Sequence, residues 1–314
     1  MAVTAAHVLY AVQLDTILGA ALLLDGISSY SLAAGIRESL LNGDGSFRPK
    51  WTAVQQQAPT VEFTTTRIAN ALAGIGVNGA IIDADLIGAD GLKMFFQKVT
   101  EGGTRAGATS HEKLTVKEGL IYPATLNATN DSDANIVYRA AITYDGTNDP
   151  IVFAGSQSLE GTPTIDEGFV CGPVTINGTT INGIQSITVD FGVTVKALFG
   201  DGQVWPTLVY VAQVRPKITV RTLDVSALRA TLTLDGVAQS VTDSAVYLRK
   251  MAEGGTRVAD ATAQHIKFSI DDGMILPRTV RGDDGSEFAL DFDIIPTYDG
   301  ANETLVISTA SALP

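Results

Sequence analysis

One five-residue motif, Glu-Gly-Gly-Thr-Arg, occurs twice in this chain, at residues 101–105 and 253–257. The offset is 152 positions (253 minus 101), and further matches at offsets of 152 to 157 cover most of the chain. They pair residues 43–45 with 200–202, Pro59 with Pro216, His111 with His265, Pro123 with Pro277, and 143–146 with 297–300. A period near 155 far exceeds the 20 to 50 residues of solenoid and propeller repeats and is the size of a domain. The sequence therefore predicts two homologous tandem domains, residues 1–157 and 158–314.

The composition favours β structure. The 314 residues are 45% hydrophobic but only 18% charged, and they include 31 glycines. Few charges with much Gly, Thr and Val are typical of strands joined by tight turns. We predict a mainly β fold, with sandwich-like or barrel-forming sheets and one α-helix per domain. Because no run approaches the roughly 18 apolar residues of a membrane helix, the surplus apolar surface is expected to contact other subunits.

The net charge of −13 argues against a grip on nucleic acid, which requires a basic stripe. It is compatible with a surface past which DNA slides. The start of the chain has no basic stretch typical of a signal peptide, so synthesis in the cytoplasm is favoured. Cys171 is the single cysteine, and the chain has three histidines, so neither a disulfide within the chain nor a zinc site is expected. We interpret His111 and His265, which occupy matching positions, as structural.

Alternating apolar residues predict half-buried strands at matched places in the two copies, at residues 30–36 and 187–195. The connection that follows each strand, residues 42–59 and 200–216, is too long for a tight hairpin. Each connection carries one of the two tryptophans, Trp51 and Trp205. Either these are plain surface loops whose Trp packs on its own domain, or they are arms that dock on a neighbouring subunit, where Trp is a common anchor.

The motif itself is preceded by a predicted helix in each copy. Leu92, Phe95, Phe96 and Val99 follow helical spacing after the possible N-cap Asp90, and the two glycines would end the helix. In the second copy the corresponding helix would begin at Asp243 and run to Met251.

The charged residues of the motif, Glu101 with Arg105 and Glu253 with Arg257, allow three interpretations: a functional acid and cation, a salt bridge that fixes the turn, or a contact between subunits. The Asp-Gly clusters at 271–273 and 283–285 lack the spacing of a calcium loop and are read as turns. Phosphate-loop and nucleophile-elbow motifs are missing from the sequence. We therefore expect no enzyme activity, no cofactor and no bound metal.

A duplicated β-rich domain of about 155 residues, with a long arm and an acidic composition, resembles the tail tube proteins of long-tailed bacteriophages. The features that carry this resemblance are the strands opening at Gly26 and Gly183, the arms with Trp51 and Trp205, and the predicted helices ahead of Glu101 and Glu253.

The resemblance implies a structural virion protein located in the tail. Its rings would contain six domains. Because each chain fuses two domains, three chains would form one ring with pseudo-sixfold symmetry. Rings would stack into a tube with an acidic lumen that conducts DNA without binding it specifically, and the arms would bind the adjacent ring. The implied partners are further copies of the chain and other phage tail proteins, with no membrane. Candidate contacts between subunits or rings are Trp51, Phe47, Trp205, Tyr210, Glu101, Arg105, Glu253 and Arg257. Two alternatives remain: another β-rich virion component, such as a capsid decoration or baseplate protein, and a carbohydrate- or calcium-binding β module.

Overall fold

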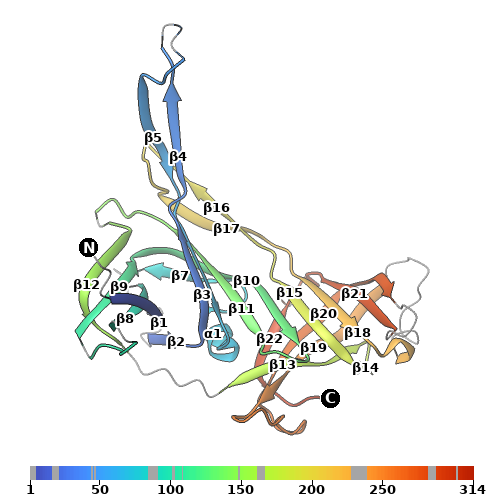
Figure 1. The fold of residues 1–314 in the computed structure, drawn as a ribbon. Helices are drawn as coiled ribbons and strands as arrows, with labels where there is room; N and C mark the ends of the chain where they lie inside the picture. Colours follow the sequence, from blue (N-terminus) through green and yellow to red (C-terminus); the bar gives the residue numbers. More distant parts are fainter. Residues whose placement is uncertain are drawn as a thin grey trace.

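The computed structural model describes residues 5–314 except 16–20, 44, 46, 84–90, 101–102, 108, 148, 161–166, 228–238, 282–287 and 302. The predicted mainly β fold is confirmed (Figure 1). Residues 1–157 contain β1 (Ala5–Asp15), β2 (Ala21–Leu24), β3 (Ile27–Ala33), β4 (Ile36–Leu41), β5 (Trp51–Gln57), β6 (Thr60–Thr65), α1 (Ile68–Ile75), β7 (Ala80–Asp83), β8 (Leu92–Thr100), β9 (Thr109–Val116), β10 (Glu118–Thr129) and β11 (Asn135–Ile142). The strand β12 (Ile151–Ser158) ends this half.

Residues 158–314 contain β13 (Gly168–Ile176), β14 (Thr179–Ile181), β15 (Ile184–Asp190), β16 (Val193–Leu198), β17 (Leu208–Val214), β18 (Lys217–Thr222), β19 (Gln239–Met251), β20 (His265–Arg281), β21 (Ala289–Pro296) and β22 (Val306–Ser311).

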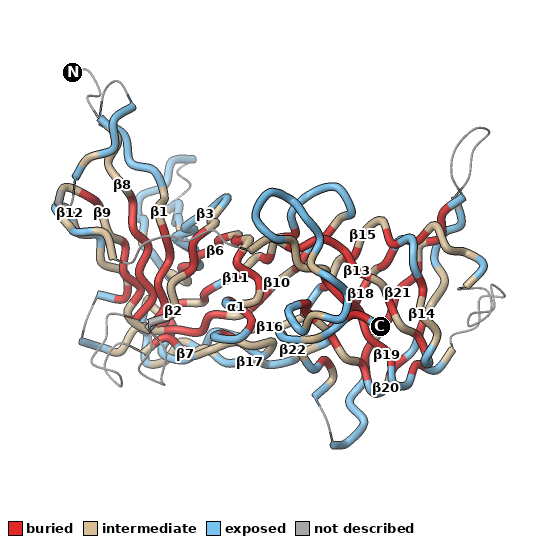
Figure 2. Tube along the Cα trace, turned by 90° about the horizontal axis from the view of Figure 1, so that it is seen from below, coloured by how far each residue is buried: buried red, intermediate tan, exposed pale blue. Residues whose placement is uncertain are grey.

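The first half places two sheets against a shared core. One sheet has the order β12-β9-β8-β1-β2, and the other includes the run β10-β11-β6-β3. Large side chains from both sheets, such as Phe63, Tyr138 and Leu14, are fully buried between them. Figure 2 shows the buried residues as bands along the middle of the strands, with exposed residues at the loops. Burial of these apolar surfaces is the main stabilising term for the fold.

The second half repeats this strand arrangement. Its strands pair in the order β14-β13-β19-β20, with β22 also on β20, and the sheet continues through β21 and β18 to β15. The 17-residue strand β20 therefore takes the place of both β9 and β10, which are separate strands in the first half.

The register repeats as well as the strand order. Strand pairs β4·β5 and β16·β17 match position by position at an offset of 157, and each ladder has an irregularity at the same place, between Arg37 and Glu38 and between Thr194 and Val195. The pairs β10·β11 and β20·β21 match at an offset of 154, again with matched irregularities after Pro123 and Pro277. We call residues at matched positions mates, and the two halves the first and second copy.

The prediction of a helix ahead of each repeated motif is wrong. Residues 92–100 form β8 and residues 239–251 include β19, both of them strands. Strand β8 lies between β1 and β9, and Lys93 and Phe95 on one face are as buried as Met94 and Phe96 on the other. Because both faces of β8 are buried, its apolar and polar residues do not alternate as they do in a half-buried strand. The remaining spacing of its apolar residues matched that of a helix. The helix of the first copy is α1, and residues 225–227 are helical at the matched place in the second.

The long connections are two-stranded arms rather than loops. Each arm is a hairpin, β4 with β5 and β16 with β17, which forms a sheet of its own. Figure 1 shows the β4–β5 arm projecting away from the sheets, whereas the β16–β17 arm crosses toward the first copy at the base of β4 and β5.

A glycine sits where each arm leaves its sheet. Gly35 and Gly192 have φ values of +57° and +60°, and a Cβ added to Gly192 would lie 1.8 Å from the carbonyl oxygen of Arg215. Arg215 in turn donates its N–H to the Gly192 carbonyl, at 3.1 Å. The chain can therefore turn and keep this contact only without a side chain.

We predict that Gly192→Ala lowers the free energy of unfolding by about 2 to 3 kcal/mol, from the positive φ together with the backbone clash. Chemical denaturation followed by Trp fluorescence measures this. The matched control is Gly202→Ala, because Gly202 has a φ of +72° with nothing within 4 Å of the added Cβ. It should cost only about 1 kcal/mol, and equal losses at both positions would contradict the clash.

Candidate assembly interface

The pairing of β10 with β15 joins the sheets of the two copies into a single 13-stranded sheet. The antiparallel register runs from Thr125 opposite Asp190 to Thr129 opposite Ser186. The inward side chains of this junction, Leu126 and Ala128 on β10 and Ile187 and Val189 on β15, have relative exposures of 0% to 1%.

Single backbone hydrogen bonds extend the junction on both sides of this ladder. Ala134 N–H donates to the Phe169 carbonyl at 2.7 Å, and Phe191 N–H donates to the Ala124 carbonyl at 3.1 Å. Both Ala134 and Phe169 are fully buried. The junction therefore covers β10 and its following loop from the first copy, and β13, β15 and residue 191 from the second.

Among the described residues, each mate of a junction strand has a backbone edge that no strand pairs: β3 pairs only with β6, and residues 276–281 of β20 pair only with β21. Strand β3, the mate of β15, ends the sheet order, and the mate of β10 is the second part of β20. Tyr30 and Leu32 on β3, the mates of Ile187 and Val189, are 48% and 43% exposed. Val280, the mate of Leu126, is 46% exposed. Apolar side chains of the kind that the junction buries are thus exposed on both of these edges.

An apolar hollow of about 390 Å³ accompanies the exposed edge of β3. Its lining residues come from both sheets of the first copy: His7, Tyr30, Leu32, Met94, Phe96, Glu112, Leu114 and Phe153. Phe96 packs against Tyr30 and Phe153, with ring centroids 5.1 and 6.2 Å apart. Met94, Phe96 and Leu114 are themselves buried in the core, as are their mates Val246, Leu248 and Phe268. The difference lies in Tyr30 and Leu32, which are exposed, whereas their mates Ile187 and Val189 are buried in a core that also contains Leu126 of β10. The second copy is closed by a strand of the first, and the first copy is open at the same place.

The arm residues selected from the sequence divide between exposed and covered positions. Phe47 and Trp51 of the first arm are 86% and 52% exposed. Tyr210 on β17 is 40% exposed, and Trp205 in the turn of the second arm is half-buried.

The charged residues of the repeated motif do not form the predicted ion pair where the structure describes both partners. Arg257 donates to the Gly255 carbonyl and contacts the sulfur of Met251, while Glu253 is exposed. Arg105 donates to the side chain of Gln97, and Glu101 lies outside the described residues. In each copy a β-bridge joins the motif arginine to the end of the strand before it, Val99 or Met251, so the motif shapes a turn.

Side chains that could bind a metal ion do not form a group in the described part of the chain. No cluster of three or more His, Cys, Asp or Glu side chains occurs there. His111 and His265 are buried, and their Nδ1 atoms accept the N–H of Lys98 and Lys250 at 3.1 and 3.0 Å, which agrees with a structural role. Asp271 and Asp272, expected in a turn, lie within β20; the cluster at 283–285 falls outside the described residues.

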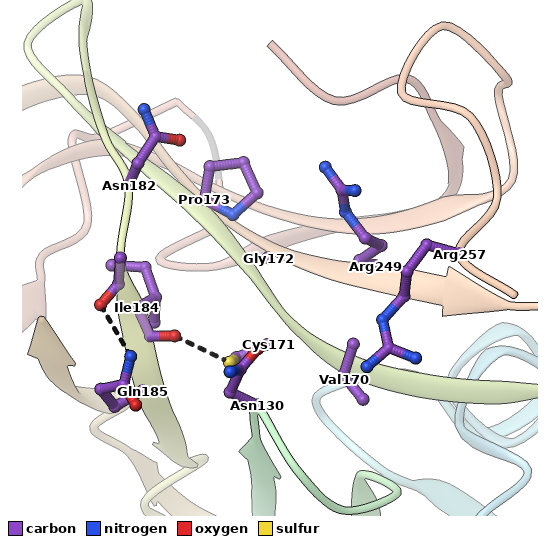
Figure 3. Close-up of a pocket in the computed structure, with 11 residues that line it drawn as sticks. Asn130, Val170, Cys171, Gly172, Pro173, Asn182, Ile184, Gln185, Arg249 and Arg257 are labelled. Atoms are coloured by element: carbon purple, nitrogen blue, oxygen red, sulfur yellow. Dashed lines mark hydrogen bonds between the residues drawn. The ribbon is translucent and has the colours of Figure 1, made fainter. Parts of the chain in front are cut away.

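A pocket of about 250 Å³ lies beside the junction and contains the single cysteine (Figure 3). Asn130 of the first copy and Cys171 face the start of β15, with Arg249 and Arg257 on the other side. The Cys171 thiol donates to the Ile184 carbonyl at 3.2 Å, and burial raises the pKa of this thiol to about 11. The thiolate, which is the reactive form, is therefore scarce at neutral pH.

We predict that Cys171 reacts roughly a hundredfold more slowly with a thiol reagent at pH 7.5 in the native protein than in urea, because its pKa is about two units above the ordinary value. Absorbance with a chromogenic disulfide reagent measures both rates. The raised pKa also implies that stability falls as pH rises above about 9, because the unfolded state then loses the proton first. Equal rates in the two states would contradict a protected thiol.

The face of the 13-stranded sheet opposite the core carries paired charges. Asp293 on β21 contacts Lys217 of β18 and Arg278 of β20, and Arg139 on β11 contacts Glu62 of β6 at 2.7 Å. Burial by itself raises the pKa of Asp293, but hydrogen bonds from Thr219, Lys217 and Arg278 outweigh it and hold the pKa below its usual value. The carboxylate therefore stays ionised and keeps both cations engaged.

No helix among the described residues has the length and apolar character needed to span a membrane. No protein-family model matches the chain, and no curated protein matches its sequence.

Proposed function

We propose that this chain is a structural virion protein, the major tail tube subunit of a long-tailed bacteriophage, built from two homologous domains at 1–157 and 158–314. The observation that carries the proposal is the covered junction within the chain together with the edges of its mates, β3 and residues 276–281 of β20, which no described strand pairs. The unpaired edge of β20 offers what β10 offers inside the chain, and β3 offers what β15 offers. Chains can therefore add head to tail through a repeat of the junction.

Head-to-tail contacts between identical chains produce either closed rings or open helical filaments. Ring closure covers the unpaired edges of β3 and β20, which removes the aggregation hazard of these two edges. By the resemblance to tail tube proteins, three chains supply six domains with pseudo-sixfold symmetry, and rings stack into a tube that conducts DNA.

The charge pattern of the sheet is compatible with passage of DNA without binding. In the proposed ring the polar face of the sheet lines the channel. Its cations Arg139, Lys217 and Arg278 each contact a carboxylate, and a cation that is already paired contributes little to phosphate binding. With a net charge of −13, the chain lacks the excess of cations on which affinity for nucleic acid depends.

Light scattering coupled to size exclusion, followed by negative-stain microscopy, tests the proposal. We expect particles of three chains or multiples of three, visible as rings, discs or tubes. Monodisperse monomers of 32.9 kDa at high concentration would overturn it. A small compact oligomer without a central channel would favour a capsid decoration or baseplate protein, and a calcium-dependent shift in melting or glycan binding would favour a binding module.

A further inference from the structure

The second arm shows how an arm can be held. Its turn lies against the first copy through two backbone hydrogen bonds: Gln57 N–H donates to the Val204 carbonyl at 2.7 Å, and Tyr144 N–H donates to the Pro206 carbonyl at 3.0 Å. Pro206 is buried and Trp205 is half-buried in this position. Figure 1 shows this arm crossing from the second copy to the base of the first arm.

The first arm has the same construction, but no backbone hydrogen bond joins the described residues of its turn to a part of the chain outside the arm. Its ladder and its irregularity match those of the second arm, and Lys50 N–H donates to the Leu41 carbonyl as Thr207 N–H does to the Leu198 carbonyl. However, Pro49, the mate of Pro206, is exposed, and Phe47, the mate of Val204, is 86% exposed. Large exposed aromatic residues on a projecting hairpin are typical anchors of a protein contact.

The second copy carries the matching seat at the free end of the chain. The mates of Gln57 and Tyr144 are Val214, at the end of β17, and Tyr298, in the turn after β21. Tyr298 is 63% exposed, whereas Tyr144 is partly covered in the first copy. The turn that bears each tyrosine is equivalent, because Asp145 accepts the N–H of Thr147 as Asp299 accepts that of Ala301.

We propose that the β4–β5 arm of one chain seats on the second copy of a neighbouring chain, at Val214 and Tyr298. The Val214 N–H would donate to the Phe47 carbonyl and the Tyr298 N–H to the Pro49 carbonyl. This inference rests on the proposed head-to-tail assembly, and it commits the arm to the same neighbour whose β20 pairs with β3. The β4–β5 arm then binds a neighbouring chain within the same ring, at the site equivalent to the one that holds the β16–β17 arm. The sequence instead suggested a contact to an adjacent ring.

Cross-linking between introduced cysteines tests the arm separately from the assembly. The arm pair is Pro49→Cys with Tyr298→Cys, and the edge pair is Leu32→Cys with Val280→Cys. A third pair, Tyr144→Cys with Pro206→Cys, calibrates the reagent because its two positions are in contact within the chain. Each pair is treated with a short bismaleimide, and the parent protein with Cys171 alone is the background.

We expect the arm pair and the edge pair each to move most of the protein into covalent dimers and larger species on a denaturing gel, while the calibrating pair stays at the monomer position. Mass spectrometry of the joined peptides identifies the linkage. An edge pair that cross-links beside an arm pair that does not would overturn the arm inference and leave the assembly standing. If neither pair cross-links and the protein is monomeric in solution, the assembly itself is wrong.

Discussion

Leu32→Asp is expected to convert the assembled protein into folded monomers of 32.9 kDa. Leu32 is 43% exposed in the isolated chain, whereas its mate Val189 is fully buried at the junction. An aspartate at this position would be solvated in the monomer but buried without a partner in the assembly. The burial costs roughly 3 kcal/mol or more at each contact, on the order of a hundredfold in affinity. Light scattering gives the mass, and circular dichroism checks that the monomer is folded.

The head-to-tail geometry leads to a second prediction, which would not follow from a symmetric contact between two chains. Val280→Asp should also give monomers, but it leaves the edge of β3 intact, while Leu32→Asp leaves the end of β20 intact. Mixing the two variants restores one complete contact, so we expect dimers of twice the monomer mass and no further growth. The matched control is Val306→Asp, because Val306 is 41% exposed but its mate Val152 is not buried by the junction. A mixture that stays monomeric, or a control that also dissociates, would contradict the contact.

Asp25→Ala is expected to lower the free energy of unfolding by about 3 to 5 kcal/mol. Asp25 and Arg67 form an ion pair at 2.7 Å, and their side chains are only 3% and 8% exposed. Removal of the carboxylate would take this counter-charge away from a buried guanidinium, the costly case for a buried pair. Urea denaturation of the monomeric Leu32→Asp background, followed by Trp fluorescence, measures the loss without interference from assembly.

The control for this pair is Glu62→Ala. Glu62 and Arg139 also lie 2.7 Å apart, but their side chains are 42% and 54% exposed. Exposed pairs contribute about 0 to 1 kcal/mol, because water solvates both charges when the contact is lost. A loss at Asp25 no larger than the loss at Glu62 would show that burial of the pair has no energetic weight.

The sequence was sufficient for the β class because its repeats and alternating segments are local signals. It could not show where the interface lies. Ile187 and Val189 are buried while Tyr30 and Leu32 are exposed, yet all four are apolar residues at the same alternating positions. Only the pairing of β10 with β15, across about 60 residues of chain, separates the covered strand from the uncovered one.

Other features could not be predicted from the sequence, for different physical reasons. The Asp25–Arg67 pair joins residues 42 positions apart, and neither residue type is repeated in the second copy, where the mates are Asn182 and Asp224. The offsets that reveal the repeat therefore give no signal for it. The arms were foreseen as long connections, but their strands were not, because Trp51 to Gln57 are mostly exposed on both faces of a hairpin.

The unbroken strand β20 has a mechanical consequence. Seventeen residues without interruption span roughly 56 Å, from His265 beside β22 to the end that carries Val280. Tension applied at that end would be transmitted along one backbone to the part of the sheet where β20 pairs with β19 and β22. In the first copy the equivalent path is interrupted at Lys117, between β9 and β10, so the same load would first bend the chain there.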